Sequence, residues 1–121
     1  MVNKALIIDD DEISLLLAGM VLEENSFARK IDTALSGAEA LNYLKQASLV
    51  CDPPQVIFLD LNMPFMDGWE FLREFEKLPD HITEKCMVAM LTSSIDVDDI
   101  EKSKRFRRVQ EFISKPLTQD K

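Results

Sequence analysis

Short apolar runs alternate with helical patterns along the chain, at about 25 residues per pair, and this alternation constrains the fold most. Residues 5–8, 56–59 and 86–91 are continuously apolar, which is typical of strands that are covered on both faces. We expect strands at residues 5–8, 28–34, 56–59, 86–91 and 111–114. Because repeated strand–helix units build a parallel sheet with helices on both sides, the sequence predicts an α/β fold.

The first expected helix covers residues 12–24 and follows a run of three aspartates. Its larger apolar residues recur at i, i+3, i+4, i+7 and i+8, which is the spacing of one helical face. These residues are Ile13, Leu16, Leu17, Met20 and Val21. We therefore expect this stripe to face the core.

Three more helices are expected, at residues 36–48, 67–78 and 96–105. Ser36 and Glu39 form an S-x-x-E capping box, which is a signature of a helix N-terminus. Asp67 and Glu70 form a similar start for the third helix. Pro79 is expected to end that helix, because proline cannot continue the backbone hydrogen bonds.

The composition indicates a folded protein of ordinary size. The 121 residues fit one compact domain, and we predict a single domain over residues 1–121. The net charge of −8 argues against nucleic acid as a direct partner. The longest apolar stretch, residues 13–22, is far shorter than the roughly 20 residues of a membrane span. No targeting segment stands out, so we expect a cytoplasmic protein without membrane insertion.

Polar residues stand where the expected strands end. Asp9 and Asp10 follow the first strand, Asp60 the third, Thr92 the fourth and Lys115 the fifth. Ligands of open parallel sheets bind beyond the carboxyl ends of the strands, so these side chains are expected to lie close together. Each residue alone has an ordinary structural explanation, such as a helix cap or a surface lysine. Their joint order favours a functional site.

Clustered carboxylates repel one another unless a cation neutralises them, so the site implies a divalent metal. Mg²⁺ fits best, because it takes a few carboxylate oxygens, keeps several waters and engages phosphate. A carboxylate beside such a metal can attack phosphorus, while a hydroxyl and an ammonium stabilise the equatorial oxygens. Asp60, Thr92 and Lys115 supply these three roles.

This order of residues resembles the CheY-like receiver family of response regulators in two-component signalling. The matching segments are residues 6–12, 58–64, 66–68, 91–94 and 112–116, and the likeness covers essentially the whole chain. Each segment is weak by itself, but together they are highly specific. The resemblance implies a flavodoxin-like, doubly wound, five-stranded parallel sheet with strand order 2-1-3-4-5.

The resemblance also assigns the metal ligands. Asp60 looks like the phosphoacceptor, and Asp10 and Asp60 are similar to the residues that bind Mg²⁺ directly. Asn62 would contribute its backbone carbonyl, and Asp9 would act mainly through water.

Further roles follow from the same resemblance. Thr92 and Lys115 would hold the phosphoryl oxygens, and Thr92 and Phe112 resemble the family's switch residues. Because Phe112 has no hydroxyl, its inward and outward rotamers would differ in packing alone. Receivers usually close with a fifth helix, but only five residues follow Pro116, so we expect that helix to be short or absent.

The expected function is a phosphoacceptor of a two-component phosphorelay. A sensor histidine kinase or a histidine phosphotransfer protein would donate the phosphoryl group, and contacts with an unidentified downstream protein would change. Such a chain catalyses only its own phosphorylation and dephosphorylation, so it is not an enzyme in the usual sense.

Two alternatives stay open. A metal-dependent phosphohydrolase with an aspartyl-phosphate intermediate shares the nucleophile, but enzymes of the haloacid dehalogenase type carry a second aspartate where Asn62 stands. A phosphorylation-independent interaction module would keep only the fold, and the intact Asp60, Thr92 and Lys115 argue against it.

Overall fold

Parallel strands form one sheet in the order β2-β1-β3-β4-β5. The computed structural model describes residues 2–49, 53–61, 66–92, 97–106 and 108–114. The strands are β1 (Val2–Ile8), β2 (Ala28–Ala34), β3 (Val56–Asp60), β4 (Met87–Thr92) and β5 (Val109–Ser114). The helices are α1 (Glu12–Glu24), α2 (Gly37–Leu49), α3 (Gly68–Phe75), α4 (Asp80–Thr83) and α5 (Val97–Ser103). The predicted α/β fold and strand order are confirmed.

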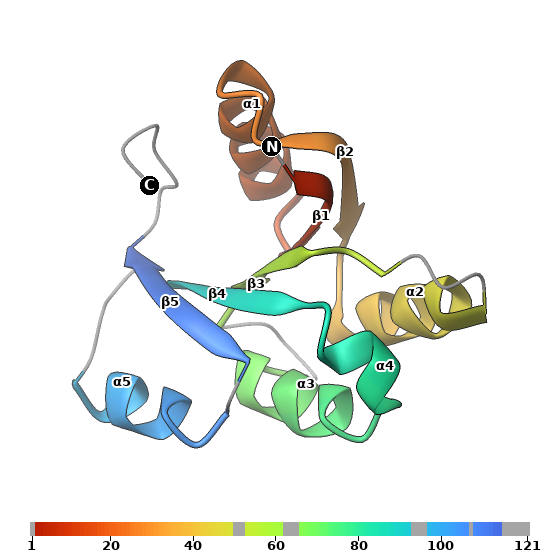
Figure 1. Ribbon diagram of the computed structural model, residues 1–121. Helices are drawn as coiled ribbons and strands as arrows, with labels where there is room; N and C mark the ends of the chain where they lie inside the picture. The colour runs from red at the N-terminus through yellow and green to blue at the C-terminus, as the bar shows by residue number, and fades with distance from the viewer. Residues whose placement is uncertain (1, 50–52, 62–65, 93–96, 107, 115–121) are drawn as a thin grey trace.

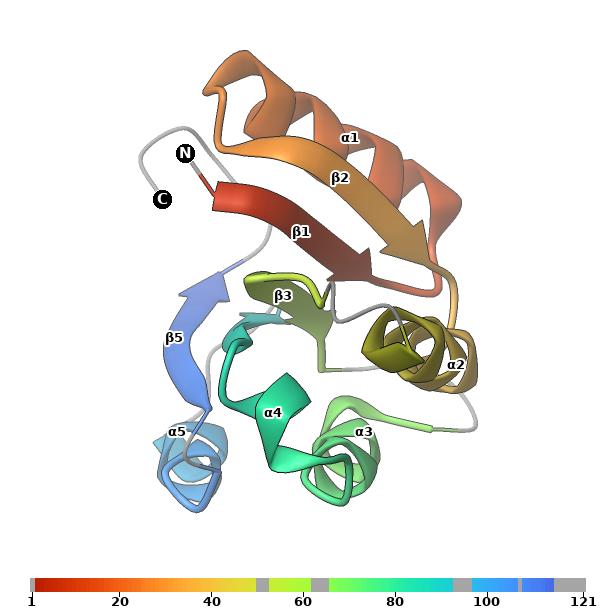
Figure 2. The same ribbon diagram turned by 45° about the vertical axis from the view of Figure 1, so that its right-hand side comes forward.

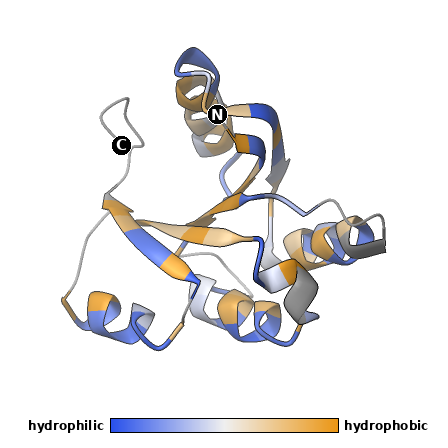
Figure 3. Ribbon diagram, viewed as in Figure 1, coloured by the Kyte–Doolittle hydropathy of each residue, from blue (hydrophilic) through white to orange (hydrophobic). Residues whose placement is uncertain are grey.

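Helices cover both faces of the sheet (Figures 1 and 2). In β1, the buried side chains of Leu6 and Ile8 join the core beneath α2 and α3, whereas those of Ala5 and Ile7 join the core beneath α1. This alternation explains why the strand is apolar at every one of these positions. Figure 3 shows the same continuous apolar character along β4, which lies between β3 and β5.

The larger core lies between the sheet and the helices α2 to α5. Phe71, Leu72 and Phe75 of α3 are fully buried there. Trp69 stacks on Phe106, with ring centroids 5.9 Å apart, and so connects the start of α3 to the segment after α5. The predicted apolar face of the third helix is therefore the buried one.

Helix α1 has the predicted bounds but not the predicted orientation. Its buried residues are Leu15, Ala18 and Leu22, which pack on the opposite face of the sheet. The stripe expected in the core is instead mostly exposed: Ile13 is 67%, Leu16 63%, Leu17 53% and Met20 47% accessible. The prediction was wrong because α1 is apolar over most of its circumference, so spacing alone could not select the packed side.

The two helix-capping interactions predicted from the sequence are present in the structure. The Glu39 amide donates to Ser36 Oγ at 3.1 Å, and the Glu70 amide donates to Asp67 Oδ1 at 2.9 Å. Helix α3, however, ends at Phe75 rather than near residue 78. Pro79 does not merely stop a helix: its carbonyl accepts from the Ile82 amide at 2.9 Å and opens the short helix α4, which was not predicted.

Several strands are longer than the apolar runs that predicted them. β1 begins at Val2, whose amide donates to the Phe27 carbonyl at 2.9 Å, and β5 begins at Val109, which pairs with Val88. Backbone pairing extends each strand past its apolar residues. No helix in the described ranges is long and apolar enough to cross a membrane.

Candidate functional site

The candidate site lies where the strand connections diverge to opposite faces of the sheet. β1 pairs with both β2 and β3, and the chain leaves β1 toward α1 on one face but leaves β3 toward α3 on the other (Figure 2). Asp9 directly follows β1, and Asp60 is the last residue of β3. Because Ile8 is in register with Leu59, the two aspartates emerge side by side at this switch point.

Three carboxylates converge there. Asp9, Asp10 and Asp60 each offer an oxygen, and these oxygens all lie within 4.8 Å of one another. Asp9 and Asp60 are only 2% and 4% accessible, whereas Asp10 is exposed. Two of the three clustered carboxylates are therefore buried, and the third lies at the protein surface.

The loop after β1 holds Asp9 in place. The Asp9 amide donates to the Ala34 carbonyl at 3.1 Å, and Asp9 Oδ1 accepts from the Asp11 amide at 3.0 Å. Asp11 instead caps α1, because its Oδ1 accepts a hydrogen bond from the Ile13 amide at 3.0 Å. Of the three consecutive aspartates, Asp9 and Asp10 belong to the cluster and Asp11 serves the helix.

The donor set fits a hard divalent cation. All three side chains present oxygen, which is the ligand type of Mg²⁺ and Ca²⁺. Three neighbouring carboxylates, two of them buried, would repel one another without a positive charge between them. An acidic pocket that can hold a metal ion is therefore built into the fold.

Thr92 ends the neighbouring strand and is 1% accessible. Its neighbour Leu91 is in register with Asp60 and accepts the Leu61 amide hydrogen at 3.0 Å through its carbonyl. Thr92 itself is in register with Ser114, the last residue of β5. The edge of the sheet thus brings Thr92 beside the end of β3, as predicted.

Two predicted site residues, Asn62 and Lys115, lie outside the described residues, as does the predicted short or absent fifth helix. Lys115 directly follows Ser114 in the chain, and Ser114 pairs with Thr92. Phe112 is half-buried in β5, in register with Met90, and packs against the larger core.

Gly68 lies beside the site, although the sequence analysis predicted no separate role for it. Its amide donates to the Leu61 carbonyl at 2.9 Å. A Cβ at this position would lie 3.0 Å from Leu61 Cα and 3.2 Å from the Asp60 carbonyl oxygen. Only glycine lets α3 begin so close to the end of β3. The Asp67-Gly68 pair at the expected start of the third helix was the one sequence feature that could have indicated this close approach.

Cys86 lies away from this site, in the larger core. Burial raises the pKa of its thiol to about 12, and the nearby Arg108 opposes that shift more weakly. A neutral buried thiol is unreactive, so Cys86 adds no chemistry of its own.

The chain matches the family model of the response regulator receiver domain over residues 5–121. Hybrid signal transduction histidine kinase L of Dictyostelium discoideum is 30% identical over 118 residues, covering 97% of this chain and 7% of that protein. Chemotaxis protein CheY of Bacillus subtilis is 27% identical over 121 residues, covering 100% of this chain and 92% of that protein. This chain thus corresponds to a small part of the kinase but to nearly all of the chemotaxis protein.

Solved structures agree with this match. The crystal structure of a two-component response regulator from Cytophaga hutchinsonii superposes with a TM-score of 0.93 and 31% sequence identity. The match covers 98% of this chain and 90% of that chain. The likeness extends over nearly all of both chains.

Proposed function

Because the chain belongs to the response regulator receiver family, we propose that Asp60 accepts a phosphoryl group from a phosphohistidine donor while Mg²⁺ is bound at the acidic cluster. Receiver domains are signalling modules of two-component systems, and the convergence of Asp9, Asp10 and Asp60 within 4.8 Å supports this role most directly. We assign residues 1–121 to one receiver domain.

In the proposed reaction, a carboxylate oxygen of Asp60 attacks phosphorus and forms a new P–O bond. The P–N bond to the donor imidazole breaks, and the nitrogen keeps the electron pair. Thr92 donates its hydroxyl hydrogen to a phosphoryl oxygen, and Lys115 neutralises another. The burial of Asp60 and Thr92 favours this assignment, because charge interactions are stronger where water is excluded.

The metal would be held by the carboxylates of Asp10 and Asp60 and the carbonyl of Asn62, with Asp9 acting through water. When bound, Mg²⁺ neutralises the negative charge that accumulates on the transferring phosphoryl group. Asp9 is suited to an orienting role, because one of its oxygens already accepts the Asp11 amide hydrogen.

Phosphorylation would change the protein's contacts through Thr92 and Phe112. A hydroxyl drawn toward the phosphoryl group vacates space near β5, and the half-buried Phe112 can repack inward. The partners would be a sensor histidine kinase or phosphotransfer protein and a downstream protein. Catalysis would be limited to the domain's own phosphorylation and dephosphorylation in the cytoplasm.

The test is incubation with acetyl phosphate, with and without Mg²⁺, followed by intact-protein mass spectrometry. We expect one added phosphoryl group that requires Mg²⁺ and is absent from Asp60→Asn, while Asp67→Asn is labelled normally because asparagine also caps helices. An unmodified wild-type chain would refute the proposal. Steady turnover of a small phosphomonoester would favour the phosphohydrolase instead.

The metal can be tested independently by calorimetric titration with Mg²⁺. Asp10→Asn should weaken binding at least tenfold, because a charged ligand becomes neutral. The matched control is Asp11→Asn, one residue along, which retains the cap of α1 and should bind as the wild type does. Equal affinities for both variants would contradict the proposed ligand set.

A further inference from the structure

A polar pocket of about 230 Å³ lies where β3, β4 and β5 begin. Because the strands are parallel, this edge of the sheet is opposite to the edge at which Asp60 ends β3. The pocket is therefore separate from the acidic cluster. Most of the side chains that line it can donate or accept hydrogen bonds: Gln55, Glu84, Lys85, Arg108 and Gln110.

Backbone hydrogen bonds between neighbouring segments form the frame of the pocket. The Met87 amide donates to the Gln55 carbonyl at 2.9 Å, which joins the starts of β4 and β3. The Val88 amide donates to the Arg108 carbonyl at 2.8 Å, which joins the starts of β4 and β5. Residues from three separate parts of the chain thus line one pocket, because the sheet aligns the strands there.

A β-bulge places a further side chain at the pocket. Val88 pairs with Val109, but the next residue, Ala89, pairs with Glu111, so Gln110 is an extra residue in β5. Bulges redirect side chains and occur often beside functional sites. Here the extra residue, Gln110, is one of those that line the pocket. The irregular pairing therefore adds an amide group to the pocket wall.

The two cations of the pocket stand without ion pairs. Among the described residues, neither Lys85 nor Arg108 forms an ion pair, whereas the exposed Lys104 pairs with Glu101 at 3.1 Å. Arg108 is half-buried, so its guanidinium has lost part of its water shell. In a chain with a net charge of −8, a bound anion would supply the partner that these cations lack.

The hydrogen-bond donors of the pocket suit a phosphate group. Arginine presents a planar fork of N–H groups and lysine a compact ammonium, and together they offer more donors than a carboxylate accepts. A phosphate group has a further oxygen and a larger negative charge. Gln55 adds its NH2 group, because its side-chain oxygen already accepts the Asn3 amide hydrogen at 2.6 Å. Phosphate therefore matches these donors better than a carboxylate does.

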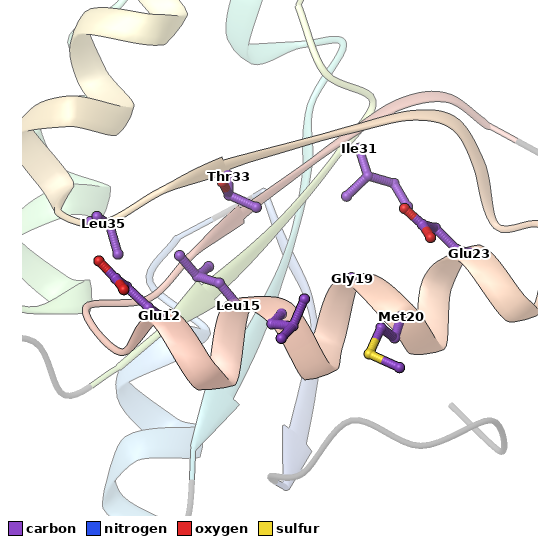
Figure 4. Close-up of a pocket in the computed structure, with 9 residues that line it drawn as sticks. Glu12, Leu15, Gly19, Met20, Glu23, Ile31, Thr33 and Leu35 are labelled. Atoms are coloured by element: carbon purple, nitrogen blue, oxygen red, sulfur yellow. The ribbon is translucent and has the colours of Figure 1, made fainter.

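The larger groove between α1 and β2, of about 420 Å³, has the opposite character (Figure 4). Its lining is mainly apolar, and its charged residues are the carboxylates of Glu12 and Glu23. The pocket at the start of β3, β4 and β5 instead carries two cations against one carboxylate, that of Glu84. Of these two hollows, only the smaller one attracts anions.

We propose that this pocket binds the phosphate group of a small ligand, either inorganic phosphate or a small phosphomonoester. Arg108 would hold two phosphate oxygens through its fork, Lys85 would add positive charge, and Gln55 would donate from its amide. A water molecule occupies about 30 Å³ in the liquid, so a pocket of about 230 Å³ has room for phosphate and a short organic group. The site is independent of the phosphoryl transfer proposed for Asp60.

The test is a titration of the isotope-labelled chain, followed by amide chemical shifts, with sodium phosphate, methyl phosphate and sodium acetate in turn. EDTA excludes metal ions from the acidic cluster, and sodium chloride keeps the ionic strength constant because salt screens exposed charges. We expect saturable shifts for both phosphate ligands at Gln55, Met87 and Gln110, and about tenfold weaker binding of acetate. The phosphate ligand that binds more tightly identifies the source of the phosphate group.

Variants that remove a positive charge locate the site. Arg108→Gln should weaken phosphate binding about tenfold or more, because charge-assisted hydrogen bonds are lost, and the exposed Lys85→Gln about threefold. Arg108→Lys keeps the charge without the fork, so its affinity should lie between those of Arg108→Gln and the wild type. Arg105→Gln removes an exposed positive charge outside the lining and should bind as the wild type does.

Glu84 provides a test of opposite sign. Its carboxylate repels an anion in the pocket, so Glu84→Gln should strengthen phosphate binding about threefold. Glu76→Gln removes an exposed carboxylate outside the lining and should leave the affinity unchanged. A gain of affinity cannot come from a variant that merely fails to fold.

The proposal is overturned if neither phosphate ligand gives saturable shifts, if acetate binds as tightly as phosphate, or if Arg105→Gln and Arg108→Gln weaken binding equally. Equal effects of Glu84→Gln and Glu76→Gln would contradict it too. Asp60→Asn should bind phosphate as the wild type does, and loss of binding in that variant would place the ligand at the acidic cluster instead.

Discussion

Helices α1 and α3 begin alike but pack differently. Each follows a strand that ends at the acidic cluster, and each is capped by an aspartate, Asp11 or Asp67, whose side chain accepts a backbone amide hydrogen. Helix α3 buries Phe71, Leu72 and Phe75 completely, whereas α1 leaves most of its large apolar side chains exposed. An N-terminal capping residue therefore does not predict how much of the helix surface is buried.

The difference arises from the neighbours of each helix. Helix α3 shares its face of the sheet with α2, α4 and α5, so it has partners on several sides (Figure 1). Among the helices of the described ranges, α1 packs alone on the opposite face. Its buried contacts come from the sheet beneath it, and Ile13, Leu16 and Leu17 on its outer side are exposed in the described part of the chain.

The largest expected difference between the two helices is in the loss of stability when one apolar side chain in each is truncated. Phe71→Ala should lower the free energy of unfolding by about 3–5 kcal/mol, because it opens a cavity in the larger core. Leu17→Ala should change it by no more than about 0.5 kcal/mol, because that side chain is 53% exposed. Urea unfolding followed by circular dichroism measures both, and similar losses would remove the contrast between the helices.

A second pair compares the two helical glycines. Gly68→Ala should cost about 1–2 kcal/mol, because the new Cβ presses on the backbone of Leu61 and Asp60. Gly19→Ala should stabilise the protein by about 0.5–1 kcal/mol, since the methyl group enters open space and the helix gains propensity. Thermal unfolding of the two variants should shift in opposite directions, and a shared direction would show that α3 is not held so tightly against β3.

The capping aspartates of α1 and α3 should contribute nearly equally to the free energy of unfolding, although the two helices differ in burial. Asp11→Ala and Asp67→Ala each remove an acceptor for one backbone amide at a helix start and should each cost about 1 kcal/mol. Chemical denaturation in the presence of excess EDTA keeps metal binding out of the measurement. A much larger loss for one of them would mean that its cap is coupled to the neighbouring site.

The smallest effect at neutral pH concerns Cys86, which belongs to the same core as α3. Its thiol has an ordinary pKa of 9.0 and a folded-state pKa of about 12, so folding favours the protonated form. This contribution to stability is complete below pH 9 and is lost as pH rises from 9 toward 12, where the unfolded state releases the proton first.

The measurement is the unfolding free energy between pH 8 and pH 11 in a Cys51→Ala background, compared with Cys51→Ala/Cys86→Val. The cysteine protein should lose stability more steeply with pH than the valine control. Parallel curves would show that the thiol is not buried as the structure has it.

The sequence predicted the fold well where one pattern had one meaning. The continuous apolar runs of β1, β3 and β4 indicated covered strands, and the capping residues Ser36 and Asp67 marked true helix starts. The packed side of α1 was mistaken because its apolar residues surround much of the helix. The short helix α4 was missed because four residues carry no periodicity.

For the site, the order of residues along the chain was sufficient to predict that Asp9, Asp10 and Asp60 would meet, because parallel strands bring their carboxyl ends to one edge. The family resemblance predicted separate tasks for Asp9 and Asp10, although three identical residues in a row do not distinguish these tasks by themselves. In the structure, Asp9 accepts the Asp11 amide hydrogen, and Asp11 accepts the Ile13 amide hydrogen at the start of α1. The role of Gly68 likewise depends on a tertiary approach that no local pattern shows.

The central claim is that Asp60, among the three clustered aspartates, forms the aspartyl phosphate. Acetyl phosphate and Mg²⁺ are added, the acyl phosphate is reduced with borohydride, and the modified residue is located by peptide mass spectrometry. The account predicts homoserine at position 60 alone, with Asp9 and Asp10 unchanged. Homoserine at position 9 or 10, or at none of the three, would contradict it.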